Sequence, residues 1–531
     1  MERPKTRHPS SAAARVSHEK VARLAGVGAV LIAARTILGQ FIAVVGTMVL
    51  TRHLSAAQFG VLGVGTAITM FAAAFADVGL AAGLIRGPRE PSRRELRSAL
   101  GVQLGAMSAL GIAAALTVAP FGRVALVTDV MLIALPLMAW QTPARVVLER
   151  ALDYRRVAAI ELGQSIVYSG WGVGTVIAGW GVWGVASATV AQAAVGSLLF
   201  AVVVAEGRLV PRVSLRDWRE LGRFGVQFQA ITFTNLIRDH GLALAVGAVL
   251  GLPALGVWNV ASRVMRLPLT LFSAVWRVSY PTMAKVVQGD SAPSKLLERA
   301  TVVAAVACGL LLVPIAGSAP VAVPVLFGHQ WRDVGLTVAP SCVSLMVGGP
   351  ISLATAGYLY AAGAARSILT SAVLHTLTWF LVALPLLPWL GVPAVGIAWI
   401  AGSAVDAAVL GRATIARTGA RIVDGLGLPV VSGVLATGLA FGVALRLPAA
   451  PSGAAATAAG GLVAYLILLG IAVKVAPSQR FVAPIAELAQ TLVAALRRSR
   501  TLPAAAGWVS MAEPAAMMSA AEPMHPPKVA R

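Results

Sequence analysis

The chain has 531 residues, of which 58% are hydrophobic and 12% are charged, and its mean hydropathy is +0.81. This composition excludes a soluble globular protein, because too little polar surface is available to cover such a chain in water. The formal net charge of +22 fits attraction to anionic membrane lipids, and no aromatic-interleaved basic fold indicates a nucleic-acid partner.

Fourteen apolar segments follow one another along the chain, and their length predicts transmembrane helices. A β-barrel would instead show ten-residue stretches of alternating polarity. We therefore predict an all-α polytopic membrane protein with about 14 transmembrane helices. The segments are 25–50, 59–84, 98–119, 126–144, 160–178, 184–205, 224–247, 254–276, 300–322, 335–358, 367–387, 394–411, 428–445 and 454–473.

Lys and Arg are concentrated on alternate connections between these segments. The poor side holds only Arg52, Arg123, Arg332 and Arg446. The positive-inside rule makes the rich side cytoplasmic, and both termini lie on that side. The basic regions are the tail 1–24, the linker 206–223, the loop 412–427 and the tail 474–531, which is amphipathic at first and then disordered.

An internal repeat is visible at the entry to the second and eighth segments. There, Leu54, Phe59, Gly60, Val61 and Val64 superpose on Leu250, Leu255, Gly256, Val257 and Val260. The match is short, so chance similarity among Gly- and Val-rich helices stays an alternative. The repeat predicts two six-helix lobes, 25–205 and 224–411, with two further helices in 428–473, an arrangement typical of alternating-access transporters.

Four arginines fall inside the apolar segments: Arg35, Arg238, Arg263 and Arg266. A charge at mid-bilayer costs at least about 2.5 kcal/mol, so these side chains are expected to face water or a partner. The alternative is a network of salt bridges between helices, in which Asp239 neutralises one arginine.

Helical spacing groups further polar residues with these arginines. Asn259 shares one face with Arg263 and Arg266, while Gln227 and Asn235 share another with Arg238. Such faces are typical of the wall of a wet cavity, and guanidinium groups match phosphate oxygens bidentately. The predicted substrate-binding residues are Arg35, Arg238, Arg263, Arg266, Asn259, Gln227 and Asn235, and the predicted cargo carries phosphate.

Acidic and other polar residues inside the segments are few. We predict Asp239 and Asp77 as candidates for an ion pair or for ion coupling. Asp406 is interpreted as a helix-end or interhelical hydrogen-bonding group, and His240 and His375 as packing residues. Cys308 and Cys342 lack metal-ligand spacing, so no metal or cofactor is predicted.

Several stretches resemble bacterial polysaccharide exporters of the MOP flippase superfamily. In the first lobe these are Thr51 to Gly60 and Asp77-Val78-Gly79-Leu80. In the second lobe they are Arg223-Phe224-Gly225, Leu255 to Arg263, Leu267-Pro268 and Tyr280-Pro281. Together these motifs favour the polysaccharide-transporter branch over the related drug antiporters.

The resemblance implies a flippase in the bacterial inner membrane that moves undecaprenyl-diphosphate-linked oligosaccharide from the cytoplasmic to the periplasmic leaflet. The lipid would enter through a lateral gap between the first and eighth segments. The resemblance also implies polysaccharide assembly proteins as partners, and the glycan would serve exopolysaccharide, capsule or O-antigen (lipopolysaccharide) synthesis.

Two alternatives stay open. One is a multidrug or metabolite antiporter of the same superfamily, which would need coupling carboxylates in the cavity. The other is a membrane polysaccharide polymerase or glycosyltransferase, although no Gly-rich phosphate loop, HExxH motif or nucleophile elbow is present. We therefore predict a transporter and no enzymatic activity.

Overall fold

The computed structural model describes residues 35–77, 80–86, 90–212, 233–288 and 293–475, and in this part of the chain the regular elements are all helical. Eleven helices are long and apolar enough to cross a membrane. The prediction of an all-α polytopic membrane protein is confirmed. The predicted helices 160–178 and 254–276 fall on α7 (Tyr154–Thr175) and α11 (Leu252–Gln288), which are not among these eleven.

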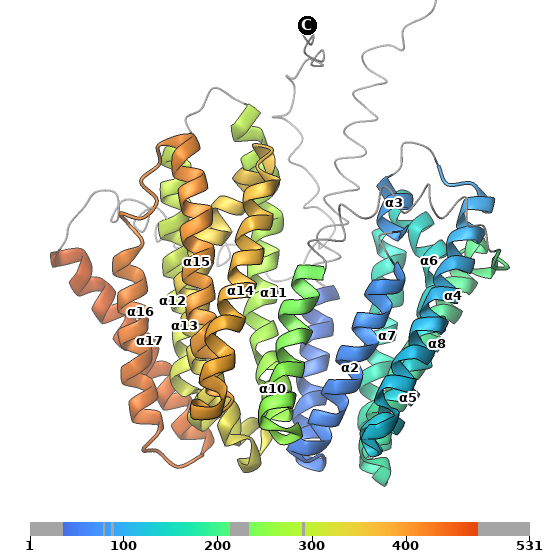
Figure 1. Cartoon of the computed structure of the whole chain (residues 1–531). Helices are drawn as coiled ribbons and strands as arrows, with labels where there is room; N and C mark the ends of the chain where they lie inside the picture. Colours follow the sequence, from blue (N-terminus) through green and yellow to red (C-terminus); the bar gives the residue numbers. More distant parts are fainter. Residues whose placement is uncertain (1–34, 78–79, 87–89, 213–232, 289–292, 476–531) are drawn as a thin grey trace, which may run out of the picture.

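The helices form two lobes that lie side by side in Figure 1. The first lobe contains the helix Arg35–His53 and α2 (Ala56–Asp77), α3 (Leu80–Arg86), α4 (Arg93–Val118), α5 (Arg123–Leu132), α6 (Ala134–Arg150), α7 and α8 (Val182–Val203). The second contains the π-helical turn η4 (Ile237–Gly241), α10 (Leu242–Leu250), α11, α12 (Pro293–Phe327), α13 (Arg332–Ala361), α14 (Ala365–Leu390) and α15 (Pro393–Thr418).

The last two helices, α16 (Gly427–Ala444) and α17 (Pro451–Val475), pack outside the second lobe against α12 (Figure 1). Tyr465 of α17 is fully buried there and lies over Gly309 of α12, where a Cβ atom would come 2.2 Å from the ring. Small residues let helices approach closely where lipid supplies no hydrophobic drive. This is the appended helix pair that the sequence predicts.

Several helices begin or end outside the predicted apolar segments. The segment 98–119, for example, belongs to α4, which starts at Arg93. Ser92 and Glu95 form a capping box there: the Ser92 hydroxyl accepts a bond from the Glu95 N–H, and the Glu95 carboxylate accepts one of 2.7 Å from the Ser92 N–H. A polar cap extends the helix beyond the run of apolar residues, so hydropathy alone underestimates its length.

The largest hydrophobic core cluster joins the two lobes, whereas none of the smaller clusters contains residues of both lobes. Phe59 of α2, Leu255 of α11 and Trp331, at the end of the turn η5 (His329–Trp331), are all fully or almost fully buried in the joint cluster. In Figure 1 the lobes meet at the lower end and diverge toward the upper end. We call the lower end, with His53 and η5, the closed end.

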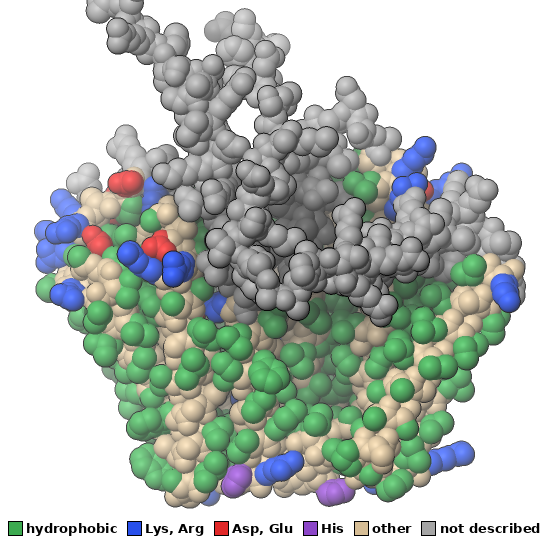
Figure 2. Space-filling model, turned by 180° about the vertical axis from the view of Figure 1, so that it is seen from behind, with side chains coloured by type: hydrophobic (Ala, Val, Ile, Leu, Met, Phe, Trp, Pro, Cys, Tyr) green, Lys and Arg blue, Asp and Glu red, His purple; other side chains and the backbone are tan. Residues whose placement is uncertain are grey.

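Charged side chains lie at the two rims of the bundle, and hydrophobic side chains cover the surface between them (Figure 2). Because the helices run up and down, the exposed Arg93, Arg155 and Arg417 lie near helix ends at the upper rim. Arg52, Arg123, Arg332 and Arg446 are exposed at helix ends at the closed end.

The topology can be tested with reporter fusions. We expect alkaline phosphatase fused after Gly328, at the closed end, to be active because that turn is predicted to face the periplasm, where the enzyme forms its disulfides. A fusion after Gly419, at the opposite end, is the matched control and is expected to be inactive. The reverse activities would overturn the predicted orientation.

Candidate functional site

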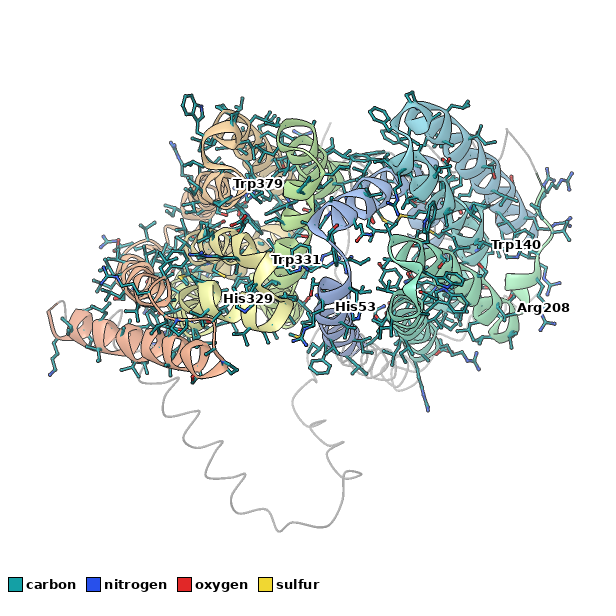
Figure 3. The ribbon with its side chains drawn as sticks, turned by 90° about the horizontal axis from the view of Figure 1, so that it is seen from below. His53, Trp140, Arg208, His329, Trp331 and Trp379 are labelled. Carbon is teal, nitrogen blue, oxygen red and sulfur yellow. The ribbon has the colours of Figure 1, made fainter. Side chains whose placement is uncertain are left out.

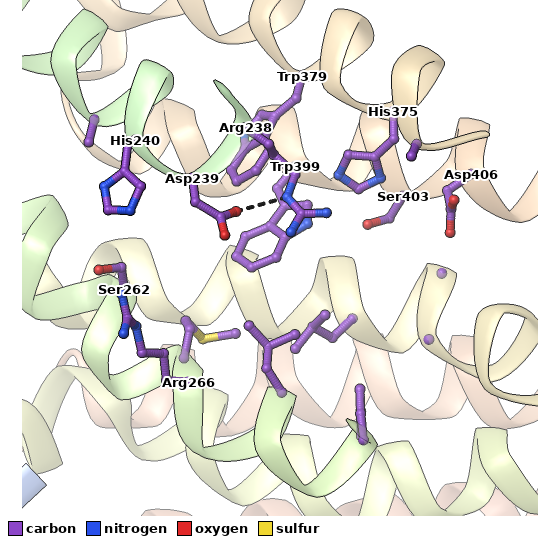
Figure 4. A pocket seen from close by; sticks show the side chains of 18 of the residues that line it. Arg238, Asp239, His240, Ser262, Arg266, His375, Trp379, Trp399, Ser403 and Asp406 are labelled. Carbon is purple, nitrogen blue, oxygen red and sulfur yellow. Dashed lines mark hydrogen bonds and ion pairs between the residues drawn. The ribbon is translucent and has the colours of Figure 1, made fainter. Parts of the chain in front are cut away.

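A cavity of about 710 Å³ lies in the second lobe and is closed on one side by α2 of the first lobe. Its walls come from η4, α11, α13, α14 and α15 (Figure 4). This volume is typical of a site that holds a small molecule or the polar head of a larger one.

The cavity brings together five residues that the sequence singles out: Asn259, Arg263 and Arg266 from α11, and Arg238 and Asp239 from η4. Arg263 and Arg266 lie about 16 and 21 Å along α11 from its first residue, at 1.5 Å per residue, which is within about 6 Å of the middle of a 30 Å hydrocarbon layer. The predicted polar face of α11 therefore lines a hollow at membrane depth.

The charges in this group are only partly balanced. Arg238 Nε donates to Asp239 Oδ1 at 2.9 Å. Arg263 Nη1 donates to the Thr47 hydroxyl at 3.1 Å, and its guanidinium lies 5.8 Å from the centre of the Phe59 ring. Among the described side chains, neither Arg263 nor Arg266 has a carboxylate within 4 Å. This part of the cavity keeps a surplus of positive charge.

The η4 turn positions Arg238, Asp239 and His240 at the edge of the cavity. A π-helical turn inserts an extra residue into a helix, rotates the side chains on either side of it, and is common at functional sites. The sequence contains no signal for this turn, because the residues around it read as one apolar helix.

Four other predicted residues are placed elsewhere or not described. Arg35 forms an ion pair with Glu161 of α7, which also binds Arg145 of α6 at 3.0 Å. Asp77 accepts a hydrogen bond of 2.5 Å from Gln103 of α4. Asn235 is half-buried just before η4 and is not among the cavity-lining residues, and Gln227 lies outside the described residues.

The opposite end of the cavity contains residues that the sequence did not assign to a site. They are His375 and Trp379 from α14 and Trp399, Ser403 and Asp406 from α15 (Figure 4). Asp406 accepts a hydrogen bond of 2.6 Å from Ser352 and another from Ser371, so it joins three helices. The sequence could have indicated Asp406 as a site residue, because an ionisable residue inside a membrane segment is by default a functional candidate.

The closed end is built from a pseudo-symmetric pair of glycines. A Cβ on Gly60 of α2 would lie 2.0 Å from the Leu252 carbonyl oxygen, and a Cβ on Gly256 of α11 would lie 1.9 Å from the Ala56 carbonyl oxygen. Gly60 and Gly256 are equivalent positions of the sequence repeat, as are Ala56 and Leu252. The two halves of the repeat therefore pack against each other, which only residues without a side chain permit.

Hydrogen bonds reinforce this contact between the lobes. The Thr51 carbonyl accepts bonds from Trp331 Nε1 at 2.9 Å and from Gln330 Nε2 at 2.6 Å. Asn259 Nδ2 donates to the Phe59 carbonyl at 3.2 Å. In the view of Figure 3, His53, His329 and Trp331 lie near the junction of the two lobes. These contacts lie between the cavity and this end of the molecule.

Two helical lobes, with a cavity in the second lobe that α2 of the first closes on one side, form a fold that solved membrane transporters share. Lipid II flippase MurJ, in an inward closed conformation, shares the fold with a TM-score of 0.60 and 12% identity, over 84% of this chain and 99% of that chain. An inward-facing multidrug resistance MATE family transporter of the MOP superfamily has a TM-score of 0.52 and 19% identity, over 72% and 95% of the two chains. A comparison with curated protein sequences finds no match.

The family model described as polysaccharide biosynthesis protein matches residues 49–336. This range covers more than half of the chain, and the chain belongs to that family. The predicted membership of a polysaccharide-transporter family is confirmed, and the fold is the one found in the MOP superfamily transporter above. The matched range includes α2, η4 and α11, which carry the three cavity arginines and the glycine contact.

The glycine contact predicts how the closed end responds to a larger residue. In Gly256→Val the new side chain collides with a backbone carbonyl, and overpacking of this kind costs about 1–3 kcal/mol. We expect the closed end to open more often, raising its accessible fraction roughly tenfold. The measurement is labelling of Ser262→Cys in the cavity by an impermeant maleimide added to intact cells, where the native Cys308 and Cys342 are buried.

Gly438→Val in α16 is the control, because nothing lies within 4 Å of the Cβ position of Gly438. Equal labelling in the two variants would show that the glycine contact does not hold this end shut.

Proposed function

We propose that this protein moves polyprenyl-diphosphate-linked oligosaccharides from the cytoplasmic to the periplasmic leaflet of the bacterial inner membrane, for the synthesis of a surface polysaccharide. The observation that supports this best is the pair Arg263 and Arg266, which face the cavity with no carboxylate within 4 Å among the described side chains. Family membership supplies the link to polysaccharide synthesis.

The chemistry of the cavity suits a diphosphate. Arg263 and Arg266 are one helical turn apart on α11, and Arg238 approaches from η4. Guanidinium groups offer planar pairs of donors that fit phosphate oxygens, and an incoming dianion removes the repulsion between neighbouring arginines. Asn259 adds an amide that can hydrogen-bond, although its Nδ2 already donates to the Phe59 carbonyl at 3.2 Å.

The lobes provide a route for alternating access. The polar head occupies the cavity while the prenyl chain stays in lipid, which avoids burying a diphosphate in hydrocarbon. The lipid enters laterally between the helix Arg35–His53 and α11, where Arg263 already contacts Thr47. Release then requires the lobes to part at the closed end. The membrane potential, negative inside, favours outward movement of the negative head.

The remaining predicted residues receive secondary roles in this proposal. Arg35 of the first helix, which is paired with Glu161 of α7, attracts the head group on its way to the cavity. Asn235, just before η4, is a secondary candidate for contact with the polar head, and Gln227 stays a sequence-based prediction outside the described residues. Asp239, which pairs with Arg238, and Asp77 are the candidates for ion coupling.

An antiporter for organic cations is the competing function, because the chain shares its fold with a MATE transporter. Such a protein needs carboxylates that are free to bind a cation. Here Asp239 is paired with Arg238, and Asp406 is outnumbered by the three arginines that line the same cavity. The charge of the cavity therefore favours an anionic cargo.

The double variant Arg263→Gln/Arg266→Gln tests the proposal. Each charge-assisted hydrogen bond contributes about 1.5–3 kcal/mol, so we expect flipping to fall at least tenfold per residue. The measurement is transfer of a fluorescent polyprenyl diphosphate oligosaccharide across the bilayer of reconstituted vesicles, together with accumulation of lipid-linked units in the inner leaflet of cells.

Arg123→Gln/Arg446→Gln is the matched control, since both arginines are exposed at the closed end and lie outside the cavity. Transfer at the normal rate in the cavity variant, or inhibition of the wild type by organic cations alone, would contradict the proposal.

A further inference from the structure

The cavity has a second end with different chemistry. Figure 4 shows Ser262, Arg266 and His240 at one side, and His375, Ser403 and Asp406 at the other. Between them lie Arg238 and the ring of Trp399. The first end carries guanidinium groups, whereas the second offers aromatic rings, hydroxyls and one carboxylate.

Two tryptophans form a fixed platform at this second end. Trp379 is 2% exposed, and its Nε1 donates to the Val395 carbonyl at 2.8 Å. Trp399 stacks on it with ring centres 4.8 Å apart and planes 21° apart. Trp399 is half-buried and lines the cavity. Because one face of its ring is held by Trp379, the ring has little freedom to move.

His375 stands beside this platform with an unused polar atom. Its ring lies edge-on to Trp379, with centres 5.9 Å apart. Its Nε2 is buried and has no hydrogen-bond partner within the described part of the chain. Nε2 lies against Gly402 of α15 and has almost no accessible surface, so Nδ1, which is not buried, is the ring nitrogen that a ligand in the cavity can reach.

Asp406 supplies acceptors at the same place. Ser352 and Ser371 each donate one hydrogen bond to its carboxylate. An ionised carboxylate has about four acceptor sites, so about two are left for another donor. The charged groups near His375 are Asp406 from α15 and Arg238 and Asp239 from η4, while Ser352 faces Asp406 from α13.

We propose that Trp399, His375 and Asp406 form a sugar subsite that binds the first sugar of the lipid-linked glycan. A pyranose has an apolar C–H face that fits an aromatic ring and a rim of hydroxyls that need a donor and an acceptor. A phosphate is the wrong ligand here, because the Asp406 carboxylate repels it. The inference rests on the proposed function, since it assigns the other part of the same substrate.

The positions of the two ends support one ligand that spans them. Asp406 and Arg266 each lie about 20 Å along their helices from the closed end, at 1.5 Å per residue. The two subsites are therefore at similar depth, and a sugar diphosphate lies across the cavity, parallel to the membrane. A site that hydrogen-bonds a hydroxyl strongly rejects ligands that lack it, so this end sets the preference for the glycan.

The test compares two ligands on the full-length protein in nanodiscs. The probes are undecaprenyl diphosphate and the same lipid carrying one hexose, N-acetylhexosamine or deoxyhexose. In the wild type we expect at least one sugar-bearing lipid to bind about tenfold or more tightly than the bare lipid. His375→Phe and Trp399→Leu should bring this ratio of affinities toward one.

Two control variants test whether the change in the ratio of affinities is specific to the sugar subsite. Trp389→Leu removes a tryptophan of α14 that is 86% exposed and outside the cavity, and should leave the ratio unchanged. Arg266→Gln should weaken both ligands and keep the ratio. Thermal unfolding of each variant checks that it is folded.

Each contrary result has a separate meaning. If the wild type binds undecaprenyl diphosphate, and binds every sugar-bearing lipid no more tightly, the subsite is overturned and the proposed function stands. Failure of the wild type to bind either lipid overturns the proposed function itself. The subsite is also overturned if the ratio of affinities is unchanged in His375→Phe and Trp399→Leu. If Asp406→Asn then alters only the pH dependence of binding, the cluster binds a proton instead of a sugar.

Discussion

The cost of holding guanidinium groups at mid-membrane depth governs this structure. A charge there is expensive unless it meets water, an opposite charge or a hydrogen-bonding ligand. Arg238 is satisfied by Asp239, but Arg263 and Arg266 have no carboxylate within 4 Å among the described side chains. They therefore require the hollow that η4, α11, α13, α14 and α15 enclose. These two arginines and the cavity therefore depend on each other, because a tightly packed bundle would leave these side chains without solvation.

The second constraint is that the two lobes must be able to meet and to part. Gly60 and Gly256 let α2 and α11 approach until backbone faces backbone. Around this backbone contact, the Phe59 and Trp331 rings pack edge to face across the lobes, and hydrogen bonds to the Thr51 carbonyl secure the same end. None of the smaller core clusters contains residues of both lobes. Parting at this end would disturb the joint cluster but leave the interior of each lobe intact.

Much of the fold was predictable, because hydropathy and the distribution of arginines each constrain it separately. The site was only partly predictable. The spacing of Asn259, Arg263 and Arg266 placed them on one face of α11, which does line the cavity. Arg35 followed the same logic, yet its partner Glu161 is distant in sequence and no local pattern relates the two. His375, Trp399 and Asp406 come from two helices and face one hollow only after α14 and α15 pack, so their grouping depends on tertiary structure.

Arg263 connects the charge constraint to the contact between lobes. Its guanidinium faces the cavity, yet it also donates to Thr47 of the first helix and lies over the Phe59 ring of α2. A guanidinium has five N–H donors, so Arg263 can bind a phosphate while its bond to Thr47 persists. An anion in the cavity therefore does not have to break the contact in order to bind. Because Thr47 and Phe59 belong to one lobe and α11 to the other, movement of the lobes must change the surroundings of the same charge that holds the anion. A single side chain thus makes anion affinity depend on the state of the closed end.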